Sequence, residues 1–247
     1  MRKFWKDWGR SRLRRKKVAW KEEGKKRAGL EAAKHVKDNL VIGLGSGNTA
    51  AYAIQEVGKR VKKDNLKVLG VPTSSQAMFL AVECGIPLTT LDEQPKIDLT
   101  IDGADQIDGA LNLIKGMGGA LTREKIVASA SKELVIVADE TKLAERLGTN
   151  QPLPVEVLPF ALSAVMSKTH EIGGKPTLRK GTGKVGPIVT DNGNFIIDAD
   201  FGPINDPYKL NMQLKMIPGV IETGLFIEMA DIVYVGKPNS VQKLKRK

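Results

Sequence analysis

Short apolar runs alternate with stretches of helical periodicity along the first part of the chain. The runs are rich in Val, Ile and Leu and are bounded by Gly, Pro or polar residues, as in strands buried on both faces of a parallel sheet. The alternation of strands and helices predicts a parallel, doubly wound α/β sheet. The expected strands cover residues 40–44, 66–71, 86–89, 97–101 and 134–138, and the expected helices cover 21–37, a stretch from residue 50, 76–84 and 120–131.

The pattern changes after Gly148. The order of elements from there is close to βαββαβ, which is the signature of a small ferredoxin-like α+β domain. A final apolar run over 232–235 is expected to rejoin the first sheet. The elements are a strand over 153–157, a helix over 160–168, a strand over 177–180, a hairpin over 188–199 turning at Asn192-Gly193, a helix over 207–216 and a strand over 220–226. We therefore expect a large domain over 21–147 plus 227–247 and an inserted small domain over 148–226.

The composition is that of a soluble globular protein. With 247 residues, 41% of them hydrophobic, the chain can bury a substantial core. No apolar run approaches the roughly 20 residues of a membrane span, and the amino terminus lacks the apolar stretch of a signal peptide. A single cysteine, Cys84, excludes an intramolecular disulfide and suits a reducing cytoplasm. The two histidines, His35 and His170, have no other metal ligand beside them, so we expect no zinc or iron site.

The net charge of +11 is concentrated at the two ends of the chain. Residues 1–17 hold nine Lys or Arg against Asp7 alone, and the tail adds four more over 243–247, which leaves the body nearly neutral. We therefore interpret residues 1–20 as a solvated basic arm rather than a nucleic-acid-binding surface. The alternative is nonspecific RNA contact by the arm, with Trp5 and Trp8 as stacking residues.

The candidate chemistry is concentrated between residues 99 and 125. Asp102 follows a buried strand, at the sheet edge where α/β proteins bind ligands, and Asp105 lies past a glycine turn. Two crowded carboxylates raise the pKa of at least one of them unless a cation intervenes, and Lys115 is the candidate cation. Glu124 falls in the first turns of a helix, whose dipole favours the ionised form of a base. Taken singly, these residues could be ordinary turn and surface positions; together they predict a proton-transfer site.

A second candidate site is the glycine turn Gly45-Ser46-Gly47-Asn48-Thr49, between a strand and a helix. Backbone N–H groups and the helix dipole make such a turn an anion site. It lacks the lysine of a Walker loop, and no acidic residue follows the second strand to hold a dinucleotide ribose. A phosphomonoester received by Ser46, Asn48 and Thr49 fits better, and Lys142 could reach the same phosphate.

The motifs GLGSGNTA, VPTSSQA, TIDGADQID, KGMGGALTREKIVA, ADETK and LPVEVLPF, in this order and spacing, resemble the type A family of ribose-5-phosphate isomerases. The resemblance spans about residues 21–240. It implies a Rossmann-like large domain with a smaller α+β domain, a homodimer or homotetramer, and no metal or organic cofactor. The implied activity is interconversion of ribose 5-phosphate and ribulose 5-phosphate in the non-oxidative pentose phosphate pathway.

The resemblance also implies roles for particular residues. Glu124 takes the substrate proton, Asp102 assists ring opening, Lys115 stabilises the enediolate, and Asp105 orients Lys115 or the sugar hydroxyls. The substrate-binding positions implied are Lys25, Ser46, Gly47, Asn48, Thr49, Gly103, Ala104, Gly116, Met117, Gly118 and Lys142, with neighbouring Lys26 as the alternative to Lys25.

Two positions depart from the family pattern. Gln106 replaces the usual glutamate after Asp-Gly-Ala-Asp, which leaves any proton role there in doubt, and Asn48 replaces a serine or threonine in the glycine turn. Asn48 can still donate a hydrogen bond. The alternatives are a non-catalytic sugar-phosphate sensor and another enzyme of similar architecture, such as a coenzyme A transferase, lactonase or deaminase. The intact Asp/Asp/Lys/Glu set favours the isomerase.

Overall fold

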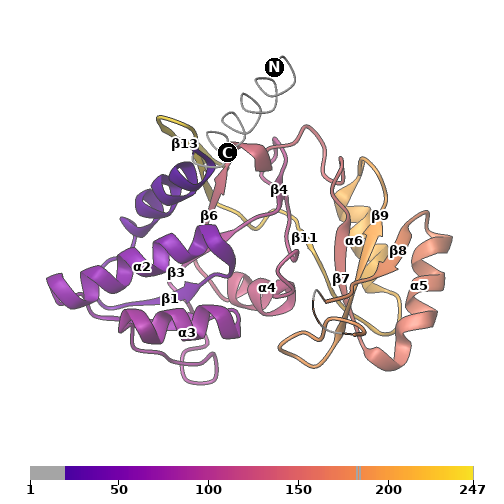
Figure 1. Ribbon diagram of the computed structural model, residues 1–247, viewed down its shortest axis with the longest axis horizontal. Coiled ribbons are helices and arrows are strands. Elements are labelled where there is room, and N and C mark those ends of the chain that lie inside the picture. Colours follow the sequence, from indigo (N-terminus) through magenta and orange to yellow (C-terminus); the bar gives the residue numbers. More distant parts are fainter. Residues whose placement is uncertain (1–19, 182, 184, 247) are drawn as a thin grey trace, which may run out of the picture.

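The computed structural model describes residues 20–181, 183 and 185–246 (Figure 1). Nearly all of the expected basic arm, including Trp5 and Trp8, lies outside the described residues. The main sheet has six strands in the order β13-β12-β6-β3-β1-β2, parallel except for β13. These strands are β1 (Leu40–Leu44), β2 (Val68–Pro72), β3 (Leu99–Gly103), β6 (Leu134–Asp139), β12 (Ile232–Gly236) and β13 (Val241–Lys245).

Both faces of the main sheet are buried. All six residues of β6 are buried, and the first five alternate between two apolar clusters. Val135 and Val137 join the cluster formed with the helix over 20–33, α2 (Gly47–Asp64) and α3 (Ser75–Cys84). Leu134 and Ile136 join a second cluster that includes Ala128 of α4 (Leu121–Ser129). A strand with two covered faces must be apolar throughout, which explains its continuous hydrophobic sequence.

The strand order reverses direction between β1 and β3. The chain passes from β1 through α2 to the edge strand β2, and then through α3 to β3 on the other side of β1. In open α/β sheets, ligands bind beyond the carboxyl ends of the strands at such a switch point. The glycine turn after β1 and Asp102 near the end of β3 lie at this position.

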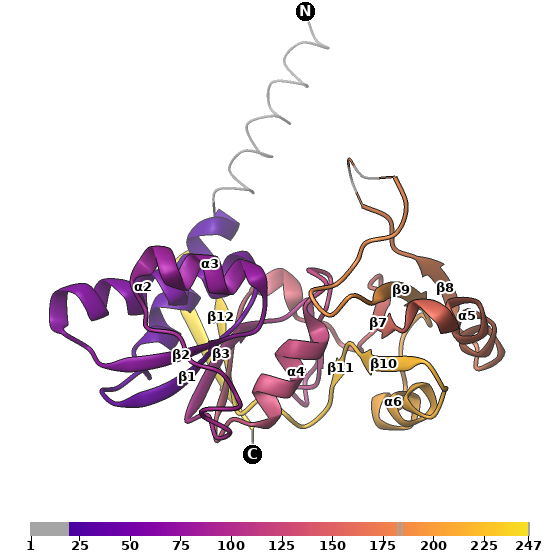
Figure 2. The same ribbon diagram turned by 90° about the horizontal axis from the view of Figure 1, so that it is seen from below.

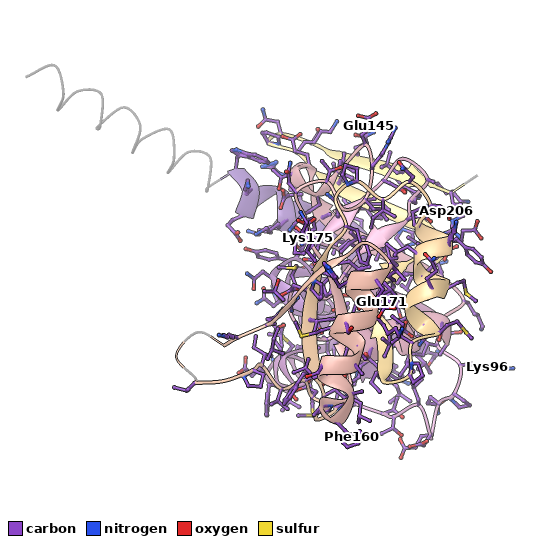
Figure 3. The ribbon with its side chains drawn as sticks, turned by 90° about the vertical axis from the view of Figure 1, so that its right-hand side faces the viewer. Lys96, Glu145, Phe160, Glu171, Lys175 and Asp206 are labelled. Atoms are coloured by element: carbon purple, nitrogen blue, oxygen red, sulfur yellow. The ribbon has the colours of Figure 1, made fainter. Side chains whose placement is uncertain are left out.

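The second sheet is antiparallel and has the order β10-β7-β9-β8. It contains β7 (Leu153–Val157), β8 (Lys175–Leu178), β9 (Phe195–Asp200) and β10 (Val220–Thr223), with α5 (Leu162–Glu171) and α6 (Pro207–Lys215). The βαββαβ order and this strand arrangement are ferredoxin-like, and the predicted fold class is confirmed. Figure 3 looks onto this part of the molecule, where Glu171 and Lys175 point outward. Figures 1 and 2 show α4 between the two sheets, in contact with β3, β7 and β10.

A third sheet of three very short strands joins the two parts. It comprises β4 (Gln106–Ile107), β5 (Leu113–Ile114) and β11 (Leu225–Phe226). The expected strand over 220–226 is therefore two strands in different sheets, divided at Gly224. A Cβ at Gly224 would lie 2.3 Å from the carbonyl oxygen of Lys115, so only glycine allows this close passage.

Other expected elements also differ from the structure. The expected strand over 86–89 is reduced to an isolated bridge between Leu88 and Gly70, since Pro87 has no N–H to donate. The strand expected over 97–101 is β3, which ends at Gly103 and therefore contains Asp102. The helix expected over 21–37 ends at residue 33. None of the described helices is long and apolar enough to cross a membrane.

Two further differences concern the carboxyl-terminal half. The first arm of the hairpin expected over 188–199 makes only isolated bridges, at Pro187 and Val189, while the second arm forms β9. No strand is predicted over the basic tail, yet β13 pairs with β12 along its full length. The ammonium of Lys243 on β13 lies over the ring of Tyr234 on β12, 5.6 Å from the ring centre, which is a cation–π contact across the two paired strands.

Candidate active site

A cavity of about 400 Å³ opens at the carboxyl ends of β1 and β3. Two predicted residues do not line it: Asp102 is buried behind Lys115, and Met117 has an exposed side chain. The predicted residues that do line it are Lys25, Ser46, Gly47, Asn48, Thr49, Gly103, Ala104, Asp105, Lys115, Gly116, Gly118, Glu124 and Lys142.

Three charged side chains meet at the floor of the cavity. The ammonium of Lys115 lies 3.0 Å from Asp102 Oδ2 and 3.1 Å from Glu124 Oε2, and it donates a hydrogen bond to Gly103 O at 2.6 Å. The side chains of Asp102, Lys115 and Glu124 come from β3, the end of β5 and the first turn of α4. The three residues are only 1%, 3% and 5% exposed, so little water screens their charges.

The protonation of this cluster is set by its burial. Burial and the nearby Asp102 raise the pKa of Glu124 to about 8, although Lys115 acts in the opposite direction. Burial also raises the pKa of Asp102, against the effect of Lys115 and of the N–H groups of Gly103 and Ser46. Burial would lower the pKa of Lys115, but the two carboxylates outweigh it and the pKa is raised. Lys115 therefore stays protonated, while Asp102 and Glu124 compete for a further proton.

This result corrects the expectation that the dipole of α4 keeps Glu124 ionised. Glu124 does lie in the first turn of α4, but the loss of hydration outweighs the favourable dipole. A carboxylate with a pKa near the working pH is a stronger base than an ordinary glutamate. The shift therefore strengthens the case for proton transfer at Glu124.

Asp105 holds the glycine-rich segment. Its Oδ2 accepts a hydrogen bond from the backbone N–H of Met117 at 2.9 Å, and its expected role in orienting Lys115 or the sugar hydroxyls stays a prediction. Arg179, which pairs with Asp198, donates to the carbonyl oxygens of Gly116 and Met117 at 2.8 and 3.1 Å. The second sheet thereby fixes the backbone that follows Lys115.

The glycine turn after β1 is packed directly against Asp102. A Cβ at Gly45 would lie 2.3 Å from Asp102 Oδ1, so glycine is required for this approach. Asp102 Oδ1 accepts from the N–H of Ser46 at 3.0 Å, and the Ser46 hydroxyl bonds to Thr73 and Ser74. The beginning of α2, with Asn48 and Thr49, is left facing the cavity, where its dipole favours an anion.

A second helix terminus lies beside the first. Helix α3 begins at Ser75, its N-cap Ser74 accepts from the N–H of Ala77, and Gln76 accepts from the N–H of Gly47 at 2.9 Å. The sequence showed the hydroxyl-rich run after the second strand but did not assign it to the site. The cavity is also lined by residues that were not predicted from the sequence: Ser74, Ser75, Gln76, Gly119, Ala120, Ile188, Val189, Thr190 and Asp191. The last four belong to the distant ferredoxin-like part and carry no local signal.

The two candidate phosphate-binding lysines have different surroundings. The Lys25 ammonium is hydrogen-bonded to Glu22 Oε1 at 2.7 Å, and the hydroxyl of Tyr52 donates to the other oxygen of Glu22. Lys142 ends a short 3₁₀ helix, Glu140–Lys142, that follows β6. Both lysines reach the cavity from elements at the carboxyl edge of the main sheet.

Gln106 has a structural explanation. Its Nε2 donates to Thr149 O at 2.9 Å and its Oε1 accepts from the N–H of Gly148 at 2.7 Å, while the residue is buried. An amide can satisfy both backbone groups, whereas an ionised carboxylate can only accept. Gln106 therefore holds the connection to the ferredoxin-like part. Within residues 20–181, 183 and 185–246, no three His, Cys, Asp or Glu residues are grouped to hold a metal ion.

The chain is similar to known proteins in both sequence and fold. The family described as ribose 5-phosphate isomerase A (phosphoriboisomerase A) matches residues 69–240. The ribose-5-phosphate isomerase A of Methanosarcina acetivorans is 50% identical over 220 residues, which are 89% of this chain and 93% of that protein. That of Thermococcus kodakarensis is 47% identical over 226 residues, 91% of this chain and 99% of its own.

Solved structures are similar over the same length. Ribose 5-phosphate isomerase A from Methanocaldococcus jannaschii has a TM-score of 0.88 and 46% identity, covering 91% of this chain and 99% of that one. A D-ribose-5-phosphate isomerase in complex with phospho-erythronic acid has a TM-score of 0.89 and 47% identity, with the same coverage.

Proposed function

The chain belongs to the ribose-5-phosphate isomerase A family and interconverts ribose 5-phosphate and ribulose 5-phosphate, and we propose that Glu124 transfers the substrate proton. The observation that carries this proposal is the buried contact between Glu124 and Lys115 at the cavity floor. A raised carboxylate pKa beside a persistent cation suits proton abstraction next to a carbonyl. The division into a catalytic domain over 21–147 plus 227–247 and a small domain over 148–226 is part of this proposal.

The phosphate group anchors the substrate in this proposal. It lies at the beginning of α2, against Ser46 to Thr49, with Lys25 and Lys142 supplying positive charge. A phosphomonoester complements the backbone N–H groups, the helix dipole and the two cations. The sugar then extends toward Lys115 and Glu124, with Gly103, Ala104, Gly116, Met117 and Gly118 as the proposed backbone surroundings.

The ring of the bound aldose must first open. Asp102 is buried in contact with Lys115, so we propose that it assists ring opening indirectly, through the Lys115 ammonium. Lys115 gives a proton to the ring oxygen as the bond between that oxygen and C1 breaks, and it regains one from the C1 hydroxyl. The open aldehyde forms and the ammonium is restored. Asp105 lines the same cavity and is available to the sugar hydroxyls.

Isomerisation then follows in two proton transfers at Glu124. The carboxylate removes the proton from C2, the electron pair forms a C1–C2 double bond, and O1 takes up negative charge. Lys115 stabilises this enediolate electrostatically, in a site that excludes most water. Glu124 returns the proton to C1 as the C2 hydroxyl loses its proton to O1, which yields ribulose 5-phosphate.

The decisive experiment measures ribulose 5-phosphate formation by the purified chain in EDTA, with Glu124→Gln assayed beside it. We expect activity to survive EDTA, and kcat of the variant to fall by about 10²- to 10⁴-fold with substrate affinity largely kept. Loss of wild-type activity in EDTA would contradict metal independence. Near-normal turnover of Glu124→Gln would contradict the assignment of the base.

We propose further that the protein acts in the cytoplasm as a homodimer or homotetramer. Large exposed apolar side chains, among them Phe79 on α3 and Met216 after α6, support association between copies. Light scattering of the full chain after size exclusion would distinguish these assemblies from a monomer. A mass of one chain at micromolar concentration would contradict this part of the proposal.

A further inference from the structure

Glu156 is a buried carboxylate that the reaction does not use. It lies on β7, within the sequence Leu-Pro-Val-Glu-Val, and is fully buried. Burying an unpaired charge is very unfavourable, so a buried carboxylate normally has a complete set of donors. Glu156 has four, all from side chains: Thr122, Thr190, Asn192 and Asn194.

The donors to the two carboxylate oxygens come from different parts of the molecule. Oε2 accepts from the hydroxyl of Thr122, at 2.5 Å, in the first turn of α4. Oε1 accepts from Thr190 Oγ1 at 2.9 Å, Asn192 Nδ2 at 3.0 Å and Asn194 Nδ2 at 2.8 Å, all in the 190–194 turn. A single carboxylate therefore joins the helix that carries Glu124 to a turn of the ferredoxin-like part.

The 190–194 turn is also held from the cavity side. Asp191, which lines the cavity, accepts from the N–H of Ser75 at the start of α3, at 2.8 Å. Arg123 donates to Asp191 O and to Asn192 Oδ1, at 2.7 Å each. In α4, Thr122 therefore contacts Glu156, Arg123 contacts the 190–194 turn, and Glu124 contacts Lys115.

We propose that Glu156 is a positioning residue for the isomerase reaction, which sets α4 and the 190–194 turn at a fixed separation across the cavity. The inference rests on the proposed function of Glu124. Because Thr122 lies two residues before the base, loss of its bond to Glu156 shifts or loosens the first turn of α4. A displacement of about 1 Å at a reacting group can lower turnover by as much as a hundredfold.

The test is the kcat and KM of Thr122→Val, which keeps the shape of the side chain and removes the donor. We expect kcat to fall by about 10- to 100-fold, with KM changed less than threefold and the fold retained. Thr122→Ser keeps the hydroxyl and should recover most of kcat. Thr169→Val is the matched control, because Thr169 is also buried, on α5, and its hydroxyl has no hydrogen-bond partner in the described part of the chain.

Glu156→Gln supplies the second arm of a double-mutant cycle. Its amide oxygen can still accept from the 190–194 turn, while its NH₂ group faces Thr122 and can only donate to that hydroxyl, so a bond to a charged carboxylate becomes a weaker neutral one. If the bond between these residues positions Glu124, both single variants lower kcat and the double variant is no worse than Thr122→Val. Additive losses would overturn the inference.

A purely structural role predicts a different result. In that case Thr122→Val lowers the thermal unfolding midpoint while kcat per folded molecule stays at the wild-type value, and the positioning role is rejected. A wild-type protein inactive on ribose 5-phosphate would instead refute the proposed function itself. An active wild type with an unimpaired Thr122→Val variant would refute only the positioning role.

Discussion

The carboxylate of Glu124 and the ammonium of Lys115 face each other across 3.1 Å at the buried floor of the cavity. Lys115 lies at almost the same distance from Asp102, so one cation serves two carboxylates. When all three groups are ionised, the cluster carries a net negative charge with little water around it. Burial makes this net negative charge unfavourable, and uptake of one proton removes it. The pKa of Glu124 is therefore raised to about 8.

The first prediction concerns the pH dependence of activity. Glu124 must be deprotonated to accept the substrate proton, so kcat/KM should rise about tenfold per pH unit below pH 8 and level off above it. The apparent pKa belongs to the Glu124 and Asp102 pair, since their titrations interact. Initial rates between pH 5.5 and 9.5 would measure it. A flat profile from pH 6.5 to 8.5 would contradict the assignment.

The second prediction concerns stability. The pKa of Glu124 is 4.5 in its ordinary state and about 8 in the folded protein, so the folded state binds more protons between these values. Its contribution to the free energy of unfolding is full below pH 4.5 and is lost as pH rises through about 8. The loss is at most about 1.4 kcal/mol per pH unit.

Glu124→Gln removes this titration, so the stability difference between variant and wild type should grow in favour of the variant from pH 4.5 to 8. Urea unfolding at pH 5 and pH 8.5 would measure both proteins. A difference that stays constant with pH would show that Glu124 titrates normally in the folded state.

The third prediction concerns phosphate binding. Lys142→Met removes a cation from the cavity and keeps most of the side-chain volume, so KM for ribose 5-phosphate should rise about tenfold or more with kcat little changed. Lys132→Met is the control, because Lys132 is exposed and pairs with Asp98 outside the cavity. Equal KM values for the two variants would show that Lys142 does not bind the phosphate.

The fourth prediction concerns Gln106. Gln106→Glu replaces the donor to Thr149 O by a buried oxygen, so the protein should lose about 1–3 kcal/mol of stability at neutral pH. The loss should shrink at low pH, because a protonated carboxyl can again donate. Urea unfolding at pH 5 and 8 would measure it. An unchanged midpoint at pH 8 would mean that the backbone over 148–149 adjusts to the carboxylate.

Much of the fold and of the site could be predicted from local sequence. The runs that became β1, β3 and β6 are mostly apolar and show no polar alternation, because both faces of the main sheet are covered. Asp102, Lys115 and Glu124 lie within one segment of 23 residues. Strand β3, the two short strands β4 and β5 and helix α4 bring them together within this segment, so the cluster was recognisable before any tertiary contact was known.

Local sequence did not predict the short strands of the third sheet. It did predict a strand over 86–89, which the structure reduces to a bridge. Strands of two residues, such as β4 and β5, have no periodicity to detect. The run over 86–89 is apolar enough for a strand, but Pro87 leaves it with a single bridge. The basic tail carries no strand signal, and it pairs because β12 would otherwise expose an open edge.

By itself, the sequence determined the alternation of elements, the polar residues at the strand ends and the set of candidate reacting groups, because these depend on neighbours a few residues apart. Only the tertiary structure decided that burial raises the pKa of Glu124, that the 190–194 turn forms a cavity wall, and that Glu156 joins this turn to α4. The reason is that desolvation and hydrogen bonding between distant segments depend on what surrounds each group after folding.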